Sequence, residues 1–211
     1  MGDPFDIKIA HINKASNIND TLSKEAVYDI LTKTNDEALV YHYKFQQVWV
    51  TSAYATFKDF DTYLILMYLI QKIYINYSDR FHFMSMDSFY RQDKIVLDKL
   101  NLIQISKSLI IPKETVRRKV NYLQENDIIF RKGKSIYLNN KALEIIKPIK
   151  SLPLLSIFFE KISEILSKEN WFGKSIKREN VEKFIRDYHT VCWEYFYRFQ
   201  IPYLTRHRKC F

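Results

Sequence analysis

Residues 105–138, ISKSLIIPKETVRRKVNYLQENDIIFRKGKSIYL, constrain the fold more than any other part of this 211-residue chain. Ile105 and Leu109 are four residues apart, the spacing of the apolar face of a short helix. Pro112 suits the first turn of a second helix, where no amide hydrogen bond is lost. A glycine between two runs of β-forming residues then predicts a hairpin over residues 128–138. The segment therefore predicts a helix, a turn, a second helix and a hairpin, in that order.

The second helix, expected over residues 113–126, has two distinct faces. At 100° per residue, Val116, Val120 and Leu123 form a narrow apolar seam that must pack on the preceding helix. Five long or hydrogen-bonding side chains share a different face, within an arc of about 140°. Because arginine, lysine, glutamate and asparagine can all read base edges in the major groove, we expect this face to read DNA sequence. Its members are Lys113, Glu114, Arg117, Arg118 and Asn121.

The stretch Ile111–Arg118, IPKETVRR, resembles the core of bacterial winged helix-turn-helix transcription regulators of the Crp, GntR and MarR types. The resemblance covers about 35 of the 211 residues. It implies that positions matching Lys113, Glu114 and Arg118 face bases and that Thr115 meets phosphate. Such families usually have glycine where this chain has Ile110, and a β-branched residue disfavours positive φ. We therefore expect a wider or differently shaped turn.

Cations around the two helices and the hairpin are expected to contact the DNA backbone. Lys132 and Lys134 flank the hairpin tip, where they would supply affinity and register rather than base choice. One of Arg117 and Arg118 is also expected to reach phosphate only. The alternative for the hairpin is a basic surface that merely keeps it in solution. The full set of expected backbone contacts is Lys107, Thr115, Lys119, Arg131, Lys132 and Lys134.

The positive charge of the chain is unevenly distributed. Residues 1–100 carry 11 Lys/Arg and 13 Asp/Glu, whereas residues 101–141 carry 9 and 3 and residues 142–211 carry 13 and 8. The net charge of +9 is therefore concentrated from the predicted helix-turn-helix onward. A concentrated excess favours a polyanionic partner over a general compositional bias.

The rest of the chain reads as helical, and the fold class is mainly α: a winged helix-turn-helix with a small antiparallel β-hairpin, flanked by additional helices. We expect an N-terminal helical region at residues 1–60, the winged unit at 61–141 and a C-terminal helical region at 142–211. The segment 61–77 is apolar almost all round, as expected of an enclosed helix. An extended connection is expected at 81–86. The expected helices outside the motif are 21–33, 36–54, 61–77, 87–100, 153–168 and 178–199.

The sequence contains no recognisable catalytic, metal or cofactor motif, and we expect a protein that is not an enzyme. Three glycines are too few and too dispersed for a dinucleotide fingerprint or a phosphate-binding loop. His189 and Cys192 are three residues apart, a spacing at which two side chains of one helix can bind the same metal ion. No other residues in the sequence are spaced to supply the remaining ligands of a zinc site. Two cysteines, no signal peptide and no long apolar run favour a cytoplasmic, nucleoid-associated protein.

Two further partners are considered besides double-stranded DNA. The C-terminal helices carry apolar residues on two sides, which favours a homodimer, with an intramolecular core as the alternative. An aromatic cluster could hold a small-molecule effector, although aromatics at such spacings more often form core. That cluster comprises Tyr41, Tyr43, Trp49, Tyr54, Tyr63 and Tyr68.

These patterns together predict sequence-specific duplex DNA binding and a role in transcription regulation. A plasmid- or phage-type replication initiator is one alternative, although that class usually carries two winged domains and this chain has one motif. An architectural DNA-binding protein is another. A winged protein-interaction module without DNA binding is the third, and the arginines on the reading face disfavour it.

Overall fold

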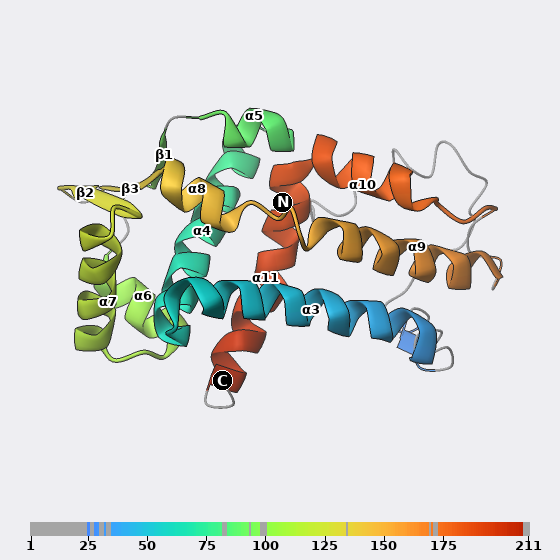
Figure 1. The fold of residues 1–211 in the computed structure, drawn as a ribbon, viewed down its shortest axis with the longest axis horizontal. Helices are drawn as coiled ribbons and strands as arrows, with labels where there is room; N and C mark the ends of the chain where they lie inside the picture. The colour runs from blue at the N-terminus through green and yellow to red at the C-terminus, as the bar shows by residue number, and fades with distance from the viewer. Residues whose placement is uncertain are drawn as a thin grey trace.

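A computed structural model describes residues 25, 28, 29, 32, 35–81, 84–92, 94–97, 101–133, 135–168, 170 and 173–208. The described part is mainly helical with one small antiparallel sheet, so the predicted fold class is confirmed. The molecule is elongated, with the sheet, α6 and α7 at one end and α9 and α10 at the other (Figure 1). The expected helix at 21–33 falls almost entirely outside the described residues.

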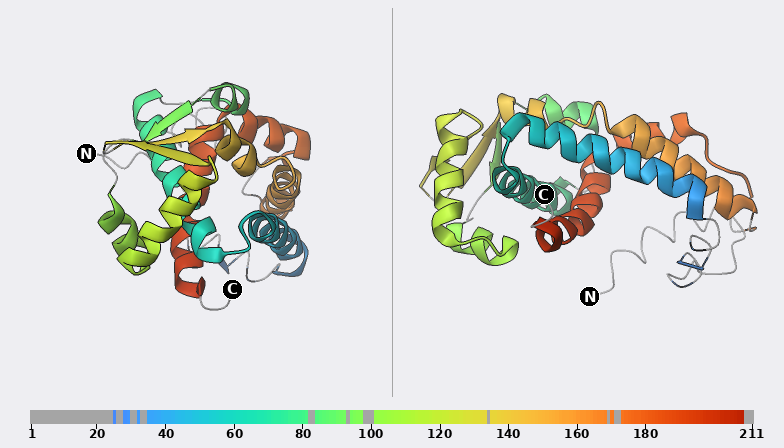
Figure 2. Two further views of the ribbon diagram at one scale, coloured as in Figure 1. Left: turned by 60° about the vertical axis from the view of Figure 1, so that its left-hand side comes forward. Right: turned by 60° about the horizontal axis from the view of Figure 1, so that its bottom comes forward.

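Three long helices form the middle of the molecule. They are α3 (Asn35–Phe57), α4 (Phe60–Phe81) and α11 (His189–His207). Every residue of α4 from 62 to 71 is buried, because α11 packs along it, α3 covers it, and α6, α7 and β1 contact it as well. The enclosed helix expected at 61–77 is therefore confirmed, and α4 packs between α11, α3 and the elements around the sheet (Figure 2).

The sheet and two short helices form the first end. In chain order its elements are β1 (Lys94–Leu97), α6 (Leu102–Leu109), α7 (Lys113–Glu125), β2 (Ile129–Lys132) and β3 (Ser135–Asn139). The strand order is β1-β3-β2, so the predicted hairpin of β2 and β3 is present and β1 adds a third strand. Leu138 pairs with Ile129 on one side and with Ile95 on the other.

The expected helix at 87–100 is wrong. Only the short α5 (Met86–Tyr90) forms, with Ser85 as its N-cap, and β1 follows. Ile95 and Leu97 are buried while Val96 is half-buried, which is the alternation of a strand. The β-branched residues fit the edge of β3, and this long-range pairing overrides the local helical pattern.

α8 (Asn140–Ile146) follows β3 and contacts it, whereas α9 (Leu152–Lys168) and α10 (Arg178–Asp187) form the second end of the molecule. The helix expected at 153–168 is confirmed as α9, but the one expected at 178–199 is two helices that meet at Tyr188. The break between α10 and α11 allows the first turn of α11 to form hydrogen bonds with the segment before α5. There the Thr190 amide donates to the Met84 carbonyl at 3.2 Å, and the Met84 amide donates to Thr190 Oγ1 at 3.0 Å.

One main hydrophobic core extends across both expected domain boundaries. It contains Phe45 of α3, Val120 of α7 and Leu204 of α11, each fully buried. The expected helix-turn-helix unit and the flanking helices thus share a single core. In the part of the chain that is described, no helix is both long and apolar enough to cross a bilayer.

Candidate nucleic-acid interface

The apolar seam of α7 fixes this helix to the body of the protein. Val116, Val120 and Leu123 are all fully buried and belong to the main core, together with Ile105 and Leu109 of α6. Burial of side chains of this size stabilises a protein by about 1.5–3 kcal/mol each. The seam predicted from helical periodicity is confirmed, and it leaves the other face of α7 outward.

The outward face of α7 carries the five residues expected to read bases. All five are exposed, and four of them border a shallow surface hollow that includes Thr115, Tyr122 and Glu125. No described residue from another element lines that hollow. The helix lies at the left-hand edge of the molecule in Figure 1 and in the right-hand view of Figure 2. The five residues are Lys113, Glu114, Arg117, Arg118 and Asn121.

Arg117 and Arg118 differ in their surroundings. Arg117 Nε donates to Glu114 Oε2 at 2.8 Å, with 60% and 73% of the two side chains exposed. Exposed pairs of this kind contribute at most about 1 kcal/mol, so phosphate can replace the carboxylate. Arg118 forms no ion pair within the described residues. Of the two guanidinium groups, that of Arg118 needs no rearrangement before it meets a ligand.

Lys119 has a structural partner instead of facing outward. Its Nζ lies 3.0 Å from Asp59 Oδ2, and only 20% of its side chain is exposed. Asp59 also accepts from the Thr62 amide at 2.8 Å, which caps the start of α4. Burial raises the pKa of Asp59, but the hydrogen bonds from Thr62 and Lys119 outweigh it and hold that pKa below its usual range. Lys119 therefore joins α7 to the cap of α4, and its expected contact with the DNA backbone stays a prediction that requires this ion pair to open.

The turn between α6 and α7 is tight and keeps the left-handed conformation, so the expectation of a wider or differently shaped turn is wrong. Ile110 adopts φ 54° and ψ 39°, the left-handed conformation usually left to glycine. Ser106 closes the turn: its carbonyl accepts from the Ile111 amide at 3.2 Å and its Oγ donates to the Ile111 carbonyl at 2.7 Å. The Ile110 side chain is 77% exposed and avoids a clash with the core.

The end of α11 braces this turn. Arg208 Nη1 donates to the Ile110 carbonyl at 3.0 Å, and Arg208 Nε lies 3.2 Å from Asp61 Oδ1 at the start of α4. The guanidinium thus joins the C-terminal helix, the central helix and the turn before α7. Nothing in the local sequence around Arg208 indicates this contact, because its partners are distant in the chain.

Two of the three hairpin cations that we expect to contact the DNA backbone are exposed in the structure. Arg131 and Lys132 are exposed, whereas Lys134 lies outside the described residues. The sequence interpretation missed an aromatic pair on this hairpin: Phe130 and Tyr137 stack with 4.6 Å between ring centroids and 6° between planes. They are directly paired in the β2–β3 register, so two aromatics at matching hairpin positions were the sequence signal that could have predicted this stacking.

Two further residues expected to contact the DNA backbone lie on the helices. Lys107 is exposed on α6, and Thr115 is half-buried at the hollow on α7.

His189 and Cys192 do not meet in a metal site. Within the described residues, no group of three or more His, Cys, Asp or Glu side chains could hold a metal ion. His189 is completely buried among aromatic rings, with Nε2 3.1 Å from Tyr74 Oη. Burial and the nearby Arg186 charge lower the pKa of His189 to about 3. The imidazole is therefore a neutral core group.

The aromatic residues considered as an effector enclosure do not surround a common space. Trp49 and Tyr63 pack edge to face at 5.6 Å and line a cavity of about 800 Å³ beside residues 144–151. Tyr68 instead bonds to Ser108 Oγ at 2.9 Å, and Tyr43 is exposed. Tyr41 does not line that cavity, and the side chain of Tyr54 is outside the described set. Within the described residues these side chains do not enclose one common space, and the small-molecule effector stays a prediction.

Comparison with family models, curated proteins and solved structures gave no match.

Proposed function

We propose that this protein binds duplex DNA and regulates transcription. In this proposal α7 enters the major groove and the β2–β3 hairpin lies on the neighbouring backbone, as in a winged helix-turn-helix. The observation that carries the proposal is the outward face of α7, where Lys113, Arg117, Arg118 and Asn121 are exposed on a helix anchored by a fully buried seam.

The exposed side chains fall into two groups by their expected role. Arg118 is placed as the principal base reader because its guanidinium is not engaged by a carboxylate and can donate twice to a guanine edge. Lys113, Glu114, Arg117 and Asn121 extend the same surface. Lys107, Thr115, Arg131 and Lys132 are placed on phosphates, and Lys134 remains a prediction. Phosphate contacts position the protein without selecting sequence.

The test is DNA binding by fluorescence anisotropy, after selection of preferred duplexes from a random pool. We expect Arg118→Ala to cost about 1–3 kcal/mol on the selected duplex and little on random duplex. Lys132→Ala should weaken both duplexes alike and reduce the slope of log affinity against log salt by about one unit. The two variants thus separate base reading from phosphate binding.

Lys183→Ala is the matched control. Lys183 is an exposed cation on α10, at the other end of the molecule, paired with Asp187. It should leave both affinities unchanged. Equal losses for Lys183→Ala and Lys132→Ala would contradict a defined interface, and equal losses on selected and random duplex would contradict base reading by Arg118. Absence of duplex binding would favour the protein-interaction alternative.

Oligomeric state is a separate part of the proposal. One apolar stripe of α11, with Trp193, Tyr197 and Leu204, is buried within the chain, as the intramolecular alternative expects. Phe199 and Tyr203 are exposed on the same helix. The homodimer thus remains a prediction that depends on this second stripe, and light scattering at micromolar concentration without DNA tests it. The replication-initiator alternative has no specific support, since the described residues contain one helix-turn-helix and hairpin.

A further inference from the structure

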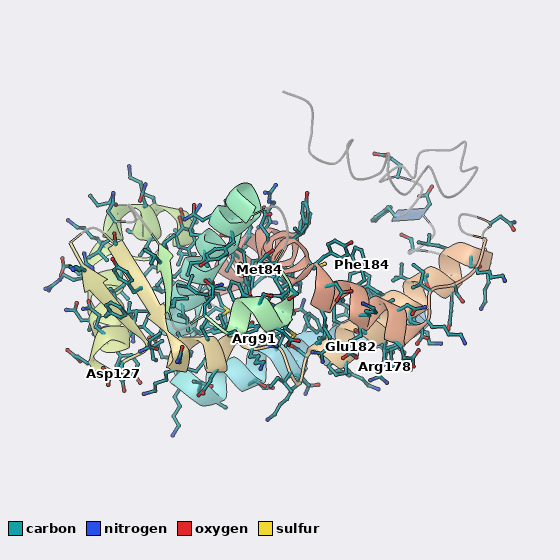
Figure 3. All side chains as sticks on the ribbon, turned by 90° about the horizontal axis from the view of Figure 1, so that it is seen from above. Met84, Arg91, Asp127, Arg178, Glu182 and Phe184 are labelled. Atoms are coloured by element: carbon teal, nitrogen blue, oxygen red, sulfur yellow. The ribbon has the colours of Figure 1, made fainter. Side chains whose placement is uncertain are left out.

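A cavity of about 720 Å³ lies at the end of the molecule away from α7, between α9, α10, α11 and α3. Its walls are mainly apolar and include Leu155, Phe158, Ile162, Ile185 and Phe196. Phe184 also lines it and projects from the side of α10 opposite Arg178 and Glu182 (Figure 3). This volume lies within the range of about 300–1,000 Å³ typical of small-molecule sites.

The cavity is uncharged. No Lys, Arg, Asp or Glu belongs to its described lining, whose polar side chains include Ser163, Asn180 and Gln200. His42 is among them, and burial lowers its pKa, which keeps the imidazole neutral. An ionised ligand would lose its hydration here without gaining an opposite charge, which is strongly unfavourable. The cavity chemistry therefore selects a neutral occupant.

Two of the lining residues each have a buried polar atom that lacks a partner in the described part of the chain. The atoms are Trp193 Nε1 and Gln200 Oε1, and Trp193 is only 2% exposed. An unsatisfied buried polar group costs about 1–3 kcal/mol. Both atoms are closed to a water molecule in the structure, so the side chain must rotate toward the cavity before an occupant can complete its hydrogen bond. The indole can only donate and the amide oxygen can only accept. They lie seven residues apart on α11, about 10 Å along the helix.

We propose that this cavity binds a neutral, largely apolar small molecule. The molecule carries an acceptor for Trp193 Nε1 and a donor for Gln200 Oε1, as a long-chain or ring compound with carbonyl or hydroxyl groups does. Apolar side chains supply most of the affinity, and the two α11 groups orient the ligand. This binding is independent of the proposed DNA contact.

The test uses two fluorescent probes that share one skeleton. N-phenyl-1-naphthylamine is neutral and has an N–H donor, whereas 1-anilinonaphthalene-8-sulfonate adds a negative charge. With the full chain, we expect saturable fluorescence enhancement for the neutral probe and affinity at least about tenfold weaker for the sulfonate, a difference of roughly 1.4 kcal/mol. 1-Decanol should displace the neutral probe, and decanoate at about pH 8, where it is ionised, should not.

Two substitutions locate the bound probe. Ile162→Phe adds bulk inside the cavity and should lower affinity for the neutral probe by about tenfold or more, because it fills space that the probe needs. Gln200→Leu removes the acceptor and should weaken the N–H probe by a few fold. Val48→Phe is the matched control, since Val48 lines only the separate cavity beside Trp49 and Tyr63. Circular dichroism and thermal melting check that each variant is folded.

Four outcomes would overturn the proposal. The neutral probe could give no enhancement, or the sulfonate could bind equally well. The control Val48→Phe could abolish binding while Ile162→Phe leaves it intact, which would place the probe in the other cavity. Finally, probe binding could fall as protein concentration rises through a monomer–dimer transition, which would show that a second copy covers the cavity.

Discussion

Lys119 illustrates that helical periodicity alone cannot predict the partner of a single side chain. It follows Arg118 directly, and both are long cations on the same helix. On a helical wheel Lys119 lies about 40° from Leu123, close to the buried seam, and this position was a signal that it does not belong to the outer face. Its partner Asp59 is sixty residues earlier in the chain. Only the folded structure reveals that pairing.

His189 makes the stability of the protein depend on pH. Its pKa is about 3 in the folded state, while an unfolded histidine titrates near 6.5. The unfolded state therefore binds the proton first, and the free energy of unfolding should fall as pH decreases below about 6.5, by up to about 1.4 kcal/mol per pH unit. We expect His189→Gln to flatten this dependence between about pH 6.5 and 4.5.

Urea unfolding at a series of pH values measures this effect. The window above about pH 4.5 is chosen because most carboxylates titrate below it. The comparison depends on slopes, so any constant stability loss caused by the substitution does not matter. An equal slope for wild type and His189→Gln would show that another group causes the pH dependence.

At the scale of elements, the sequence predicted helices with a one-sided apolar pattern and missed a strand whose pairing is distant. The seam of α7 and the buried run of α4 could be predicted because periodicity records burial directly. By contrast, β1 depends on pairing with β3, some forty residues later. The residue pattern of the candidate interface was likewise visible in sequence, but the stacking of Phe130 on Tyr137 and the brace from Arg208 come from tertiary contacts.

The α6–α7 turn carries a measurable conformational cost. A left-handed conformation costs an L-residue with a branched side chain about 1–2 kcal/mol, and asparagine tolerates it better. The Ile110 side chain is exposed, so its replacement removes little burial. We expect Ile110→Asn to raise the free energy of unfolding by about 0.5–1 kcal/mol in urea denaturation.

Ile110→Val is the control for this substitution. Valine keeps the β-branched side chain and should give no gain in stability. Arg208 bonds to the backbone carbonyl at this position, so its brace is retained in both variants. A loss of stability in Ile110→Asn would mean that the isoleucine side chain makes contacts that outweigh the backbone cost.

At the scale of the whole molecule, α4 links the proposed DNA-binding end to the ligand cavity. It contacts α6, α7 and β1 at one end, and α11 along its length. The three regions expected from sequence were based on local patterns, which cannot show that their apolar faces meet in one core. Because that core is continuous from Phe45 to Leu204, we expect the regions to unfold together.

Leu204→Ala tests this cooperativity. Leu204 is fully buried near the end of α11, and truncation of a buried leucine typically costs about 2–5 kcal/mol. If the molecule is one cooperative unit, this loss must appear equally in α7, which is remote in sequence. Native-state hydrogen exchange of peptides from α7 and α11, measured by mass spectrometry in low denaturant, reports the opening free energy of each helix. Unchanged protection of α7 alongside a weakened α11 would instead establish that the end proposed to bind DNA is stable without the C-terminal helices.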